Sequence, residues 1–172
     1  SELSVASIFD SNQGNVRYKQ SFHDWTEGTR CKYCGAPEEL FDRDVELENH
    51  AYEVIHRNSN EISEAFNNMK FDVIVGNPPY QLETAGAQAQ ATPLYNLFVE
   101  QAIKLNPKYI VMIIPSRWFT GGFGLKSFRN KMLNDKRLRV LVDHLDARDV
   151  FPGVEIKGGV CYFLWDRDYS GT

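Results

Sequence analysis

The sequence predicts an α/β fold in which a mostly parallel sheet is flanked by helices. From residue 71 onward, short apolar runs rich in β-branched residues alternate with segments whose apolar residues recur at helical spacing. Prolines and glycines separate these segments. Such alternation is typical of parallel sheets, because each parallel connection needs a crossover, usually a helix. The chain of 172 residues is long enough for one main core and a small additional unit.

The expected elements follow in order along the chain. Strands are predicted at 71–75, 109–114, 138–145 and 159–165, with a further candidate at 16–22. Thr92 and Pro93 are placed to cap and begin a helix before the second of these strands. Its apolar face comprises Leu94, Leu97, Phe98, Ala102 and Leu105. The next helix is lined by Leu125, Phe128, Met132 and Leu133, and an earlier helical stretch is expected near 45–55.

Three regions are predicted: an N-terminal piece of the main domain at 1–25, an acidic insertion at 26–70, and the C-terminal part of the main domain at 71–172. Basic residues gather in the third region, where they can meet phosphate or form a solvated helix face. They are Lys126, Arg129, Lys131, Lys136, Arg137 and Arg139.

The most informative stretch is the apolar run at 71–75, which ends at a glycine and is followed by Asn77, Pro78, Pro79 and Tyr80. Each proline fixes its own φ at about −65° and keeps the preceding residue out of the helical region, so Asn77 and Pro78 are held extended. Neither proline has a backbone N–H. The loop therefore presents two acceptors, the Asn77 side-chain oxygen and the Pro78 carbonyl oxygen. The alternative is a plain turn that ends the strand.

Two converging acceptors suit an exocyclic NH₂ group. The lone pair of an aryl or amide NH₂ is delocalised, and acceptors that hold its two hydrogens favour a pyramidal nitrogen whose lone pair can be aimed at an electrophile. This chemistry depends on positioning and preorganised electrostatics rather than on prior removal of a proton. The ring of Tyr80 can stack on the planar ring that carries the amine.

Asn-Pro-Pro-Tyr at the end of an apolar strand resembles the signature of amino-methyltransferases that use S-adenosylmethionine. Above all, it resembles that of the adenine-specific (N6) DNA methyltransferases of restriction-modification systems. The segments 109–119, 128–133, 138–145 and 150–165 are similar to later strands and helices of that family's catalytic domain. The resemblance implies a partial Rossmann-like, S-adenosylmethionine-dependent methyltransferase domain, and an internal fragment of a larger enzyme.

The activity implied by the resemblance is site-specific N6-methylation of adenine in double-stranded DNA, with the adenine flipped out of the duplex. In this interpretation Asn77 and Pro78 hold the amine, Pro79 fixes the loop and Tyr80 stacks on the base. One alternative is an amino-methyltransferase for a protein glutamine or an rRNA base. Another is a non-catalytic module that binds zinc or DNA. The isolated fragment is expected to be inactive.

No residue can be assigned to the cofactor. Members of the family resemble one another in a glycine-rich loop and a following acidic residue that holds the ribose, and this loop would precede Asn77. The sequence before Asn77 contains no such loop, so the S-adenosylmethionine site is expected to lie upstream of the chain. Asp10 and Asp24 are candidates for a contact with the adenine of the cofactor, but plain surface roles are favoured. The recognition sequence and a fused nuclease cannot be identified.

The segment Cys31-Lys32-Tyr33-Cys34-Gly35 has the form of a zinc knuckle. His50 and His56 follow at Cys-x₂-Cys-x₁₅-His-x₅-His, a spacing that fits a structural Cys₂His₂ site. Zinc would supply folding energy to a segment with few core residues. The alternative is a reduced pair of thiols and two surface imidazoles.

Five other residues are expected in ordinary roles. His23 and His144 show no ligand spacing. Cys161 falls in a predicted strand, so we expect it in the core. Trp118 and Phe119 follow another strand, and core positions are favoured over walls of a base pocket.

The overall composition limits the class of protein. The net charge is −4, and three cysteines do not make a disulfide framework. No apolar run approaches the roughly 18 residues of a membrane span, and no signal peptide opens the chain. A cytoplasmic protein without a membrane partner is expected, and its oligomeric state is not predicted.

Overall fold

The computed structural model describes residues 23–38, 53–65, 68, 70–82 and 91–171. The chain divides into two compact units, Ser1–Lys70 and Phe71–Thr172. The predicted strand at 16–22 and most of the predicted helix at 45–55 lie outside the described residues. The division of the first unit into an N-terminal piece and an insertion stays a prediction.

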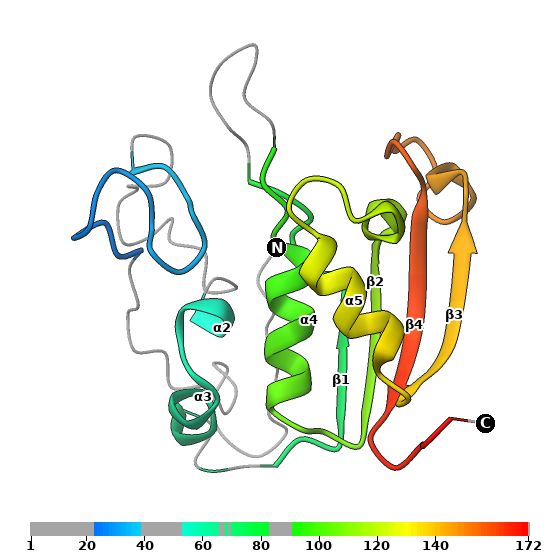
Figure 1. The fold of residues 1–172 in the computed structure, drawn as a ribbon, viewed down its shortest axis with the longest axis horizontal. Coiled ribbons are helices and arrows are strands. Elements are labelled where there is room, and N and C mark those ends of the chain that lie inside the picture. The colour runs from blue at the N-terminus through cyan, green and yellow to red at the C-terminus, as the bar shows by residue number, and fades with distance from the viewer. Residues whose placement is uncertain (1–22, 39–52, 66–67, 69, 83–90, 172) are drawn as a thin grey trace. The chain divides into compact units, whose positions relative to one another are not determined.

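The second unit contains a four-stranded sheet and two α-helices (Figure 1). Its elements in chain order are β1 (Val73–Gly76), α4 (Tyr95–Lys104), β2 (Tyr109–Pro115), the 3-10 helix η3 (Ser116–Thr120), α5 (Lys126–Asn134), β3 (Leu138–His144), the 3-10 helix η4 (Ala147–Asp149) and β4 (Val160–Asp166). All four strands predicted from residue 71 onward are present, with ends that differ by at most two residues.

The sheet has the strand order β1-β2-β4-β3, and it is not mostly parallel as the sequence predicts. β1 and β2 are parallel, whereas β4 pairs antiparallel with both β2 and β3. β1, β2 and β3 therefore run in one direction, and β4 runs between β2 and β3 in the other. One reversed strand in an interior position makes two of the three pairings antiparallel. The α/β class is confirmed, and the expectation of a mostly parallel sheet is wrong.

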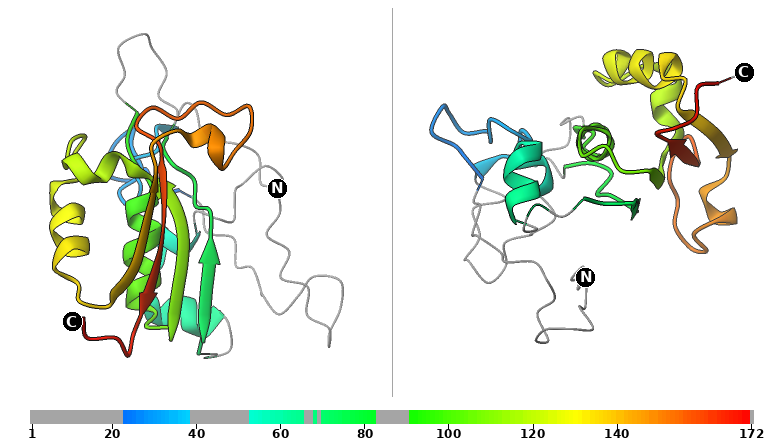
Figure 2. Two further views of the ribbon diagram at one scale, coloured as in Figure 1. Left: turned by 90° about the vertical axis from the view of Figure 1, so that its right-hand side faces the viewer. Right: turned by 90° about the horizontal axis from the view of Figure 1, so that it is seen from below.

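The burial pattern of β2 shows which face of the sheet is covered. Ile110, Met112 and Ile114 are buried, and the residues between them are partly exposed. Successive side chains of a strand point to opposite faces, so one face carries the core. α4 and α5 both lie on that side (Figure 2). The core cluster comprises Tyr95, Val99, Ala102, Ile110, Met112, Ile114, Trp118, Leu125, Phe128, Met132, Cys161, Phe163 and Trp165.

The other face of the sheet is apolar but open within the described part of the chain. Val73 and Val75 of β1 are 49% and 70% exposed, and Val140 and Tyr162 are each 40% exposed. Strands that are apolar on both faces lack a clear alternation of apolar and polar residues. For this reason the strands are recognisable in the sequence as continuous apolar runs.

Tertiary pairing delays the start of α4. The sequence predicts Thr92 as cap and Pro93 as the first helical residue, but Leu94 is the N-cap. Pro93 instead pairs with Gln81 in an isolated antiparallel bridge. A local capping signal contributes only about 1 kcal/mol, so pairing with a distant segment can override it. The prediction for the start of this helix is therefore wrong by two residues.

Helix α5 buries three of its four predicted core residues. Leu125, Phe128 and Met132 are buried, but Leu133 is exposed. Adjacent helical residues differ by about 100° in direction, so Leu133 points away from the face that carries Met132.

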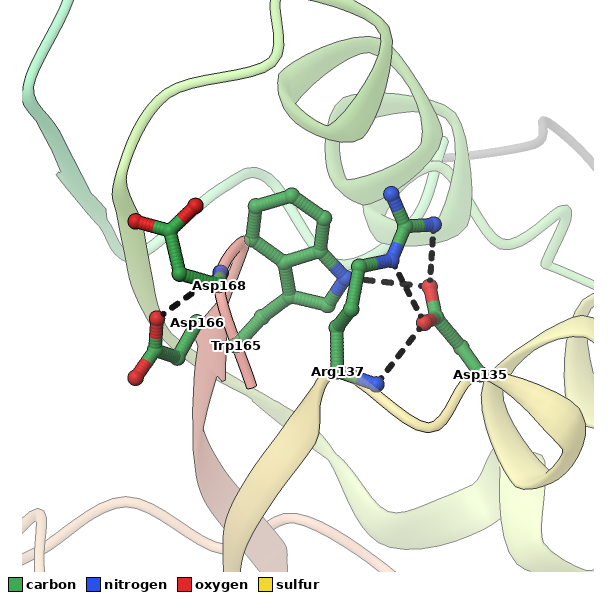
Figure 3. A network of polar contacts seen from close by, with 5 residues as sticks. All are labelled: Asp135, Arg137, Trp165, Asp166 and Asp168. Atoms are coloured by element: carbon green, nitrogen blue, oxygen red, sulfur yellow. Dashed lines mark hydrogen bonds and ion pairs between the residues drawn. The ribbon is translucent and has the colours of Figure 1, made fainter. Parts of the chain in front are cut away.

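A polar network closes the end of α5 (Figure 3). The Asp135 carboxylate accepts hydrogen bonds from Arg137 through its backbone N (3.0 Å), Nε (2.8 Å) and Nη2 (2.8 Å). It also accepts one from Nε1 of Trp165 (3.0 Å), whose ring is buried. The Arg137 guanidinium lies 4.6 Å from the centroid of that ring. Burial by itself raises the pKa of Asp135, but the bonds from Arg137 and Trp165 hold it below its ordinary value.

The first unit has little regular structure in its described part. It contains the short helices α2 (Glu53–His56) and α3 (Ser59–Ala65). Asn58 caps α3, because its Oδ1 accepts from the backbone N of Asn60 and Glu61, both at 3.0 Å. Glu61 in turn accepts from the Asn58 backbone N (2.8 Å), which completes a capping box. Within the described residues of both units, no helix is long and apolar enough to cross a membrane.

Candidate functional site

The loop after β1 exposes the Asn77 side-chain amide and buries the residue that follows it. Asn77 is exposed, Pro78 is buried, and Pro79 and Tyr80 are partly buried. β1 and β2 are parallel neighbours, so both end at the same edge of the sheet. In open α/β sheets, ligands bind at the carboxyl ends of such strands. The Asn77 side chain is therefore accessible where an α/β fold places its ligand.

Backbone hydrogen bonds fasten this loop to the segment before α4. The carbonyl oxygen of Tyr80 accepts from the Leu94 backbone N (3.1 Å), and the Leu82 backbone N donates to the Thr92 carbonyl oxygen (2.9 Å). Leu82 and Leu94 are fully buried, so both anchors are shielded from water. The four motif residues thus lie between a strand and a second fixed point. Such a loop can hold a ligand without first having to be ordered.

Two tyrosine hydroxyls are buried, one in the motif loop (Tyr80) and one at the start of α4 (Tyr95). Within the described residues, neither Tyr80 nor Tyr95 forms a hydroxyl hydrogen bond of normal geometry. Burial raises the pKa of both phenols, and the nearby Cys161 thiol acts in the same direction. The Asn77 side chain lies close enough to the Tyr80 hydroxyl to lower its pKa slightly, but less than burial raises it. Both phenols are therefore neutral at physiological pH and cannot serve as bases.

A second polar pair lies at the same edge of the sheet. Ser116 directly follows β2, and its hydroxyl donates to the carboxylate of Asp143 near the end of β3. β2 and β3 run in the same direction, so their ends meet at one edge. This pair was not predicted from the sequence. The signal was a serine after a buried strand and an acid inside an apolar one.

Trp118 and Phe119 belong to the core, as the sequence predicts. Trp118 is fully buried, and its Nε1 donates to the Cys161 sulfur at 3.4 Å. Phe119 packs against the same cluster. Cys161 is fully buried in β4, so its predicted core position is confirmed as well.

Most of the basic residues in and after α5 interact within the chain. Arg129 Nε donates to the Phe119 carbonyl oxygen (2.7 Å), and Lys131 pairs with Glu100 (2.7 Å). Arg137 is held by Asp135, as described above. Arg139 pairs with Asp166 (3.0 Å) and lies over the ring of Tyr169. Four of the six basic residues thus have partners within the chain, and phosphate contact by this group stays a prediction.

A separate cluster of potential metal ligands lies within the first unit. His23, Cys31, Cys34 and His56 are all buried, and one ligand atom from each lies within 4.8 Å of the others. Cys34 Sγ is 3.4 Å from His23 Nδ1 and 3.3 Å from His56 Nε2. Cys31 Sγ is 3.8 Å from the same His56 atom. The structure thus brings together three of the four predicted metal ligands.

His23 occupies the remaining position of this cluster. His23 was predicted to have an ordinary role, and His50, the fourth predicted ligand, lies outside the described residues. Burial lowers the pKa of His23, and it lowers that of His56 to about 4, so both imidazoles are neutral. Burial also raises the pKa of the Cys34 thiol to about 12. Neutral imidazoles are the form in which histidine binds a metal.

The acidic candidates for a cofactor contact gain no support. Asp10 lies outside the described residues. Asp24 pairs with Lys32 and accepts from Thr26 through its backbone N (3.0 Å) and its hydroxyl (2.6 Å). The hydrogen bonds from Lys32 and Thr26 lower the pKa of Asp24 to about 2. Asp24 is therefore a surface acid with local partners.

Comparison with known proteins identifies the family. The Eco57I restriction-modification methylase family matches residues 1–151. An "uncharacterized adenine-specific methylase" from Mycoplasma pneumoniae is 37% identical over 174 residues, which cover 95% of this chain and 41% of that protein. The chain therefore spans less than half the length of this relative. The chain belongs to the Eco57I restriction-modification methylase family, and the resemblance to adenine-specific methyltransferases of restriction-modification systems is confirmed.

Proposed function

We propose that the protein to which this chain belongs transfers a methyl group from S-adenosylmethionine to the N6 amine of adenine in double-stranded DNA. The observation that carries this proposal is the exposed Asn77 amide on a rigid loop at the carboxyl edge of the sheet. Family membership and the name of the Mycoplasma pneumoniae relative support the same chemistry. Because cellular DNA is the proposed substrate, we also propose a cytoplasmic location.

The residues of the loop have separate roles in this proposal. The Asn77 side-chain oxygen and the Pro78 carbonyl oxygen accept the two N–H groups of the adenine amine. Pro79 removes a competing donor and fixes the backbone. Tyr80 offers its ring face to an adenine that has left the duplex. The amine then presents its nitrogen lone pair without prior deprotonation, which agrees with the neutral state of Tyr80 and Tyr95.

The chain does not by itself fit a complete cofactor site. S-adenosylmethionine supplies the electrophilic methyl group in this chemistry. Binding its adenosine part requires the protein backbone to come close to it, which glycines allow. The sequence before β1 has only isolated glycines, at positions 14, 28 and 35. We therefore assign no cofactor contact to these residues and propose roles on the amine side of the reaction only.

Substitution of Asn77 tests the proposal in the full-length protein. Asn77→Ala removes an acceptor that acts on the reacting amine, so methyl transfer to DNA should fall on the order of 10²–10³-fold. Binding to the same DNA should remain, because the loop contributes only a small part of a DNA interface. Asn77→Asp should keep more activity than Asn77→Ala, because a carboxylate also accepts hydrogen bonds. Asn130→Ala, an exposed asparagine on α5, serves as the matched control.

The substrate assay separates the alternatives. Radiolabelled methyl transfer should be measured with duplex DNA, ribosomal RNA and glutamine-containing protein, followed by identification of the methylated product. N6-methyladenine in DNA supports the proposal. Near wild-type DNA methylation by Asn77→Ala refutes the role of the loop, and methylation of RNA or glutamine alone refutes the DNA substrate.

A further inference from the structure

We propose that His23, Cys31, Cys34 and His56 bind one zinc ion, and that this ion stabilises the segments that carry its ligands. The four ligand atoms come from two segments, 23–34 and α2, which are far apart in the sequence. This inference does not depend on the methyltransferase activity.

The distances between the ligand atoms match tetrahedral zinc. Bonds of about 2.3 Å to sulfur and about 2.0–2.1 Å to nitrogen, at tetrahedral angles, place a sulfur and a nitrogen about 3.5 Å apart. Three of the four sulfur–nitrogen distances in the cluster are 3.3, 3.4 and 3.8 Å. All four atoms lie within 4.8 Å of one another, so a single ion can reach each of them. Two thiolates and two imidazoles are a common structural zinc set.

The backbone around the cysteines has the shape of a knuckle. The Gly35 backbone N donates to the Cys31 carbonyl oxygen (2.7 Å), and the Cys31 backbone N donates to the Ala36 carbonyl oxygen (2.8 Å). Gly35 has a φ of 75°, in the left-handed region that favours glycine. This turn folds the chain back directly after Cys34, so both sulfurs point to the same side. The geometry is present without any bond between the two cysteines, which are free.

Most of the buried residues in the described part of the first unit are these ligands. Among its described residues, those that are buried are His23, Cys31, Cys34, Ala36, His56 and Ile62. Four of these six are the cluster itself, and only Ala36 and Ile62 are ordinary apolar residues. The described segments of the unit thus bury little apolar surface to offset the conformational entropy of ordering them. Zinc binding would stabilise these segments, because its binding free energy becomes folding free energy.

Metal analysis and spectroscopy of the full-length protein test this inference. We expect about one zinc per chain, and X-ray absorption should show two sulfur neighbours near 2.3 Å and two nitrogen neighbours near 2.0–2.1 Å. Exchange with cobalt(II) should give the ligand-field bands of a tetrahedral site and a thiolate charge-transfer band. These measurements use the wild-type protein, so they do not depend on the folding of any variant.

Substitutions identify the ligands. Cys31→Ser and His23→Ala should reduce the zinc content to below about a tenth of the wild-type value. His50→Ala should keep about one zinc per chain, because in this proposal His23 completes the set of four ligands. Cys161→Ala should also keep the zinc, because Cys161 belongs to β4 of the second unit.

Three results would overturn the inference. Wild-type protein purified with zinc present could contain none. A Cys31–Cys34 disulfide could form, with a mass loss of two hydrogens and no metal. Zinc could also be lost in His50→Ala and kept in His23→Ala, which would remove His23 from the site.

Discussion

Removal of the Asp135 carboxylate should destabilise the second unit by about 2–3 kcal/mol. The largest contribution comes from Trp165, because its buried Nε1–H would lose its acceptor and an unsatisfied buried donor costs about 1–3 kcal/mol. The side chain of Arg137 is 39% exposed, so its ion pair with Asp135 adds at most about 1 kcal/mol. Asp135→Ala therefore tests a buried donor far more than a salt bridge.

The chain contains a close control for this substitution. Asp146 accepts from the backbone N and the guanidinium of Arg148, two residues later, as Asp135 does from Arg137. Asp146 and Arg148 are 44% and 69% exposed, and within the described residues Asp146 has no hydrogen bond from a buried indole. Asp146→Ala should therefore reduce stability clearly less than Asp135→Ala does.

Urea unfolding, followed by far-UV circular dichroism, measures the free energy of unfolding of both variants. In thermal unfolding, the loss expected for Asp135→Ala in a unit of about 100 residues corresponds to a decrease of about 10–20 °C in Tm. Trp165→Phe removes the indole N–H, so in that background Asp135→Ala should cost about 1 kcal/mol or less. Equal losses in Asp135→Ala and Asp146→Ala would refute the reasoning. So would an unchanged loss in the Trp165→Phe background.

The remaining predictions concern pH, the motif loop and one glycine. The pKa of Asp135 is lowered on folding, so its contribution to the free energy of unfolding is fully present above about pH 4 and is lost as pH falls through the folded pKa. Asp135→Asn should therefore make stability less dependent on pH in that range. Tyr80→Phe should keep methyl transfer, because the Tyr80 hydroxyl has no hydrogen bond of normal geometry in the described structure, whereas Tyr80→Ala should lower it. Gly158→Ala should cost about 1 kcal/mol in chemical denaturation for its positive φ, and Gly159→Ala should cost at least about 3 kcal/mol, because its Cβ would lie 2.1 Å from the His144 carbonyl oxygen. Equal losses for the two glycines, or an inactive Tyr80→Phe, would contradict these expectations.

The sequence predicted the strands well because their signals are local. Each apolar run from residue 71 onward ends at proline, glycine or a polar residue. These strand-terminating residues fall within two residues of the observed strand ends. The core position of Trp118 followed from the same logic. By contrast, Leu133 lies one residue beyond the buried Met132, and composition alone does not resolve a helix face at that precision.

The errors at the start of α4 and in the metal cluster have a different cause, which is contact between distant segments. Nothing near Pro93 indicates that it will pair with Gln81 and thereby delay α4. Likewise, the spacing of Cys31 and Cys34 indicates a knuckle but does not identify its partners. His23 precedes the knuckle and has no motif spacing, so only the folded chain brings it to Cys34. Local patterns therefore identify half-sites better than complete sites.

The reversed direction of β4 explains why residue 159 is a glycine, which turn chemistry alone does not. Because β4 runs opposite to β2 and β3, its first residues lie at the edge where those strands end, and Val160 pairs with both Pro115 and His144. The preceding residue, Gly159, must then pass the end of β3 at a distance that leaves no room for a Cβ. Its carbonyl oxygen accepts from the Ser116 backbone N (3.1 Å), so the same passage fixes the start of η3 beside the polar edge. The insertion of one strand thus determines both the glycine and the position of Ser116 next to Asp143.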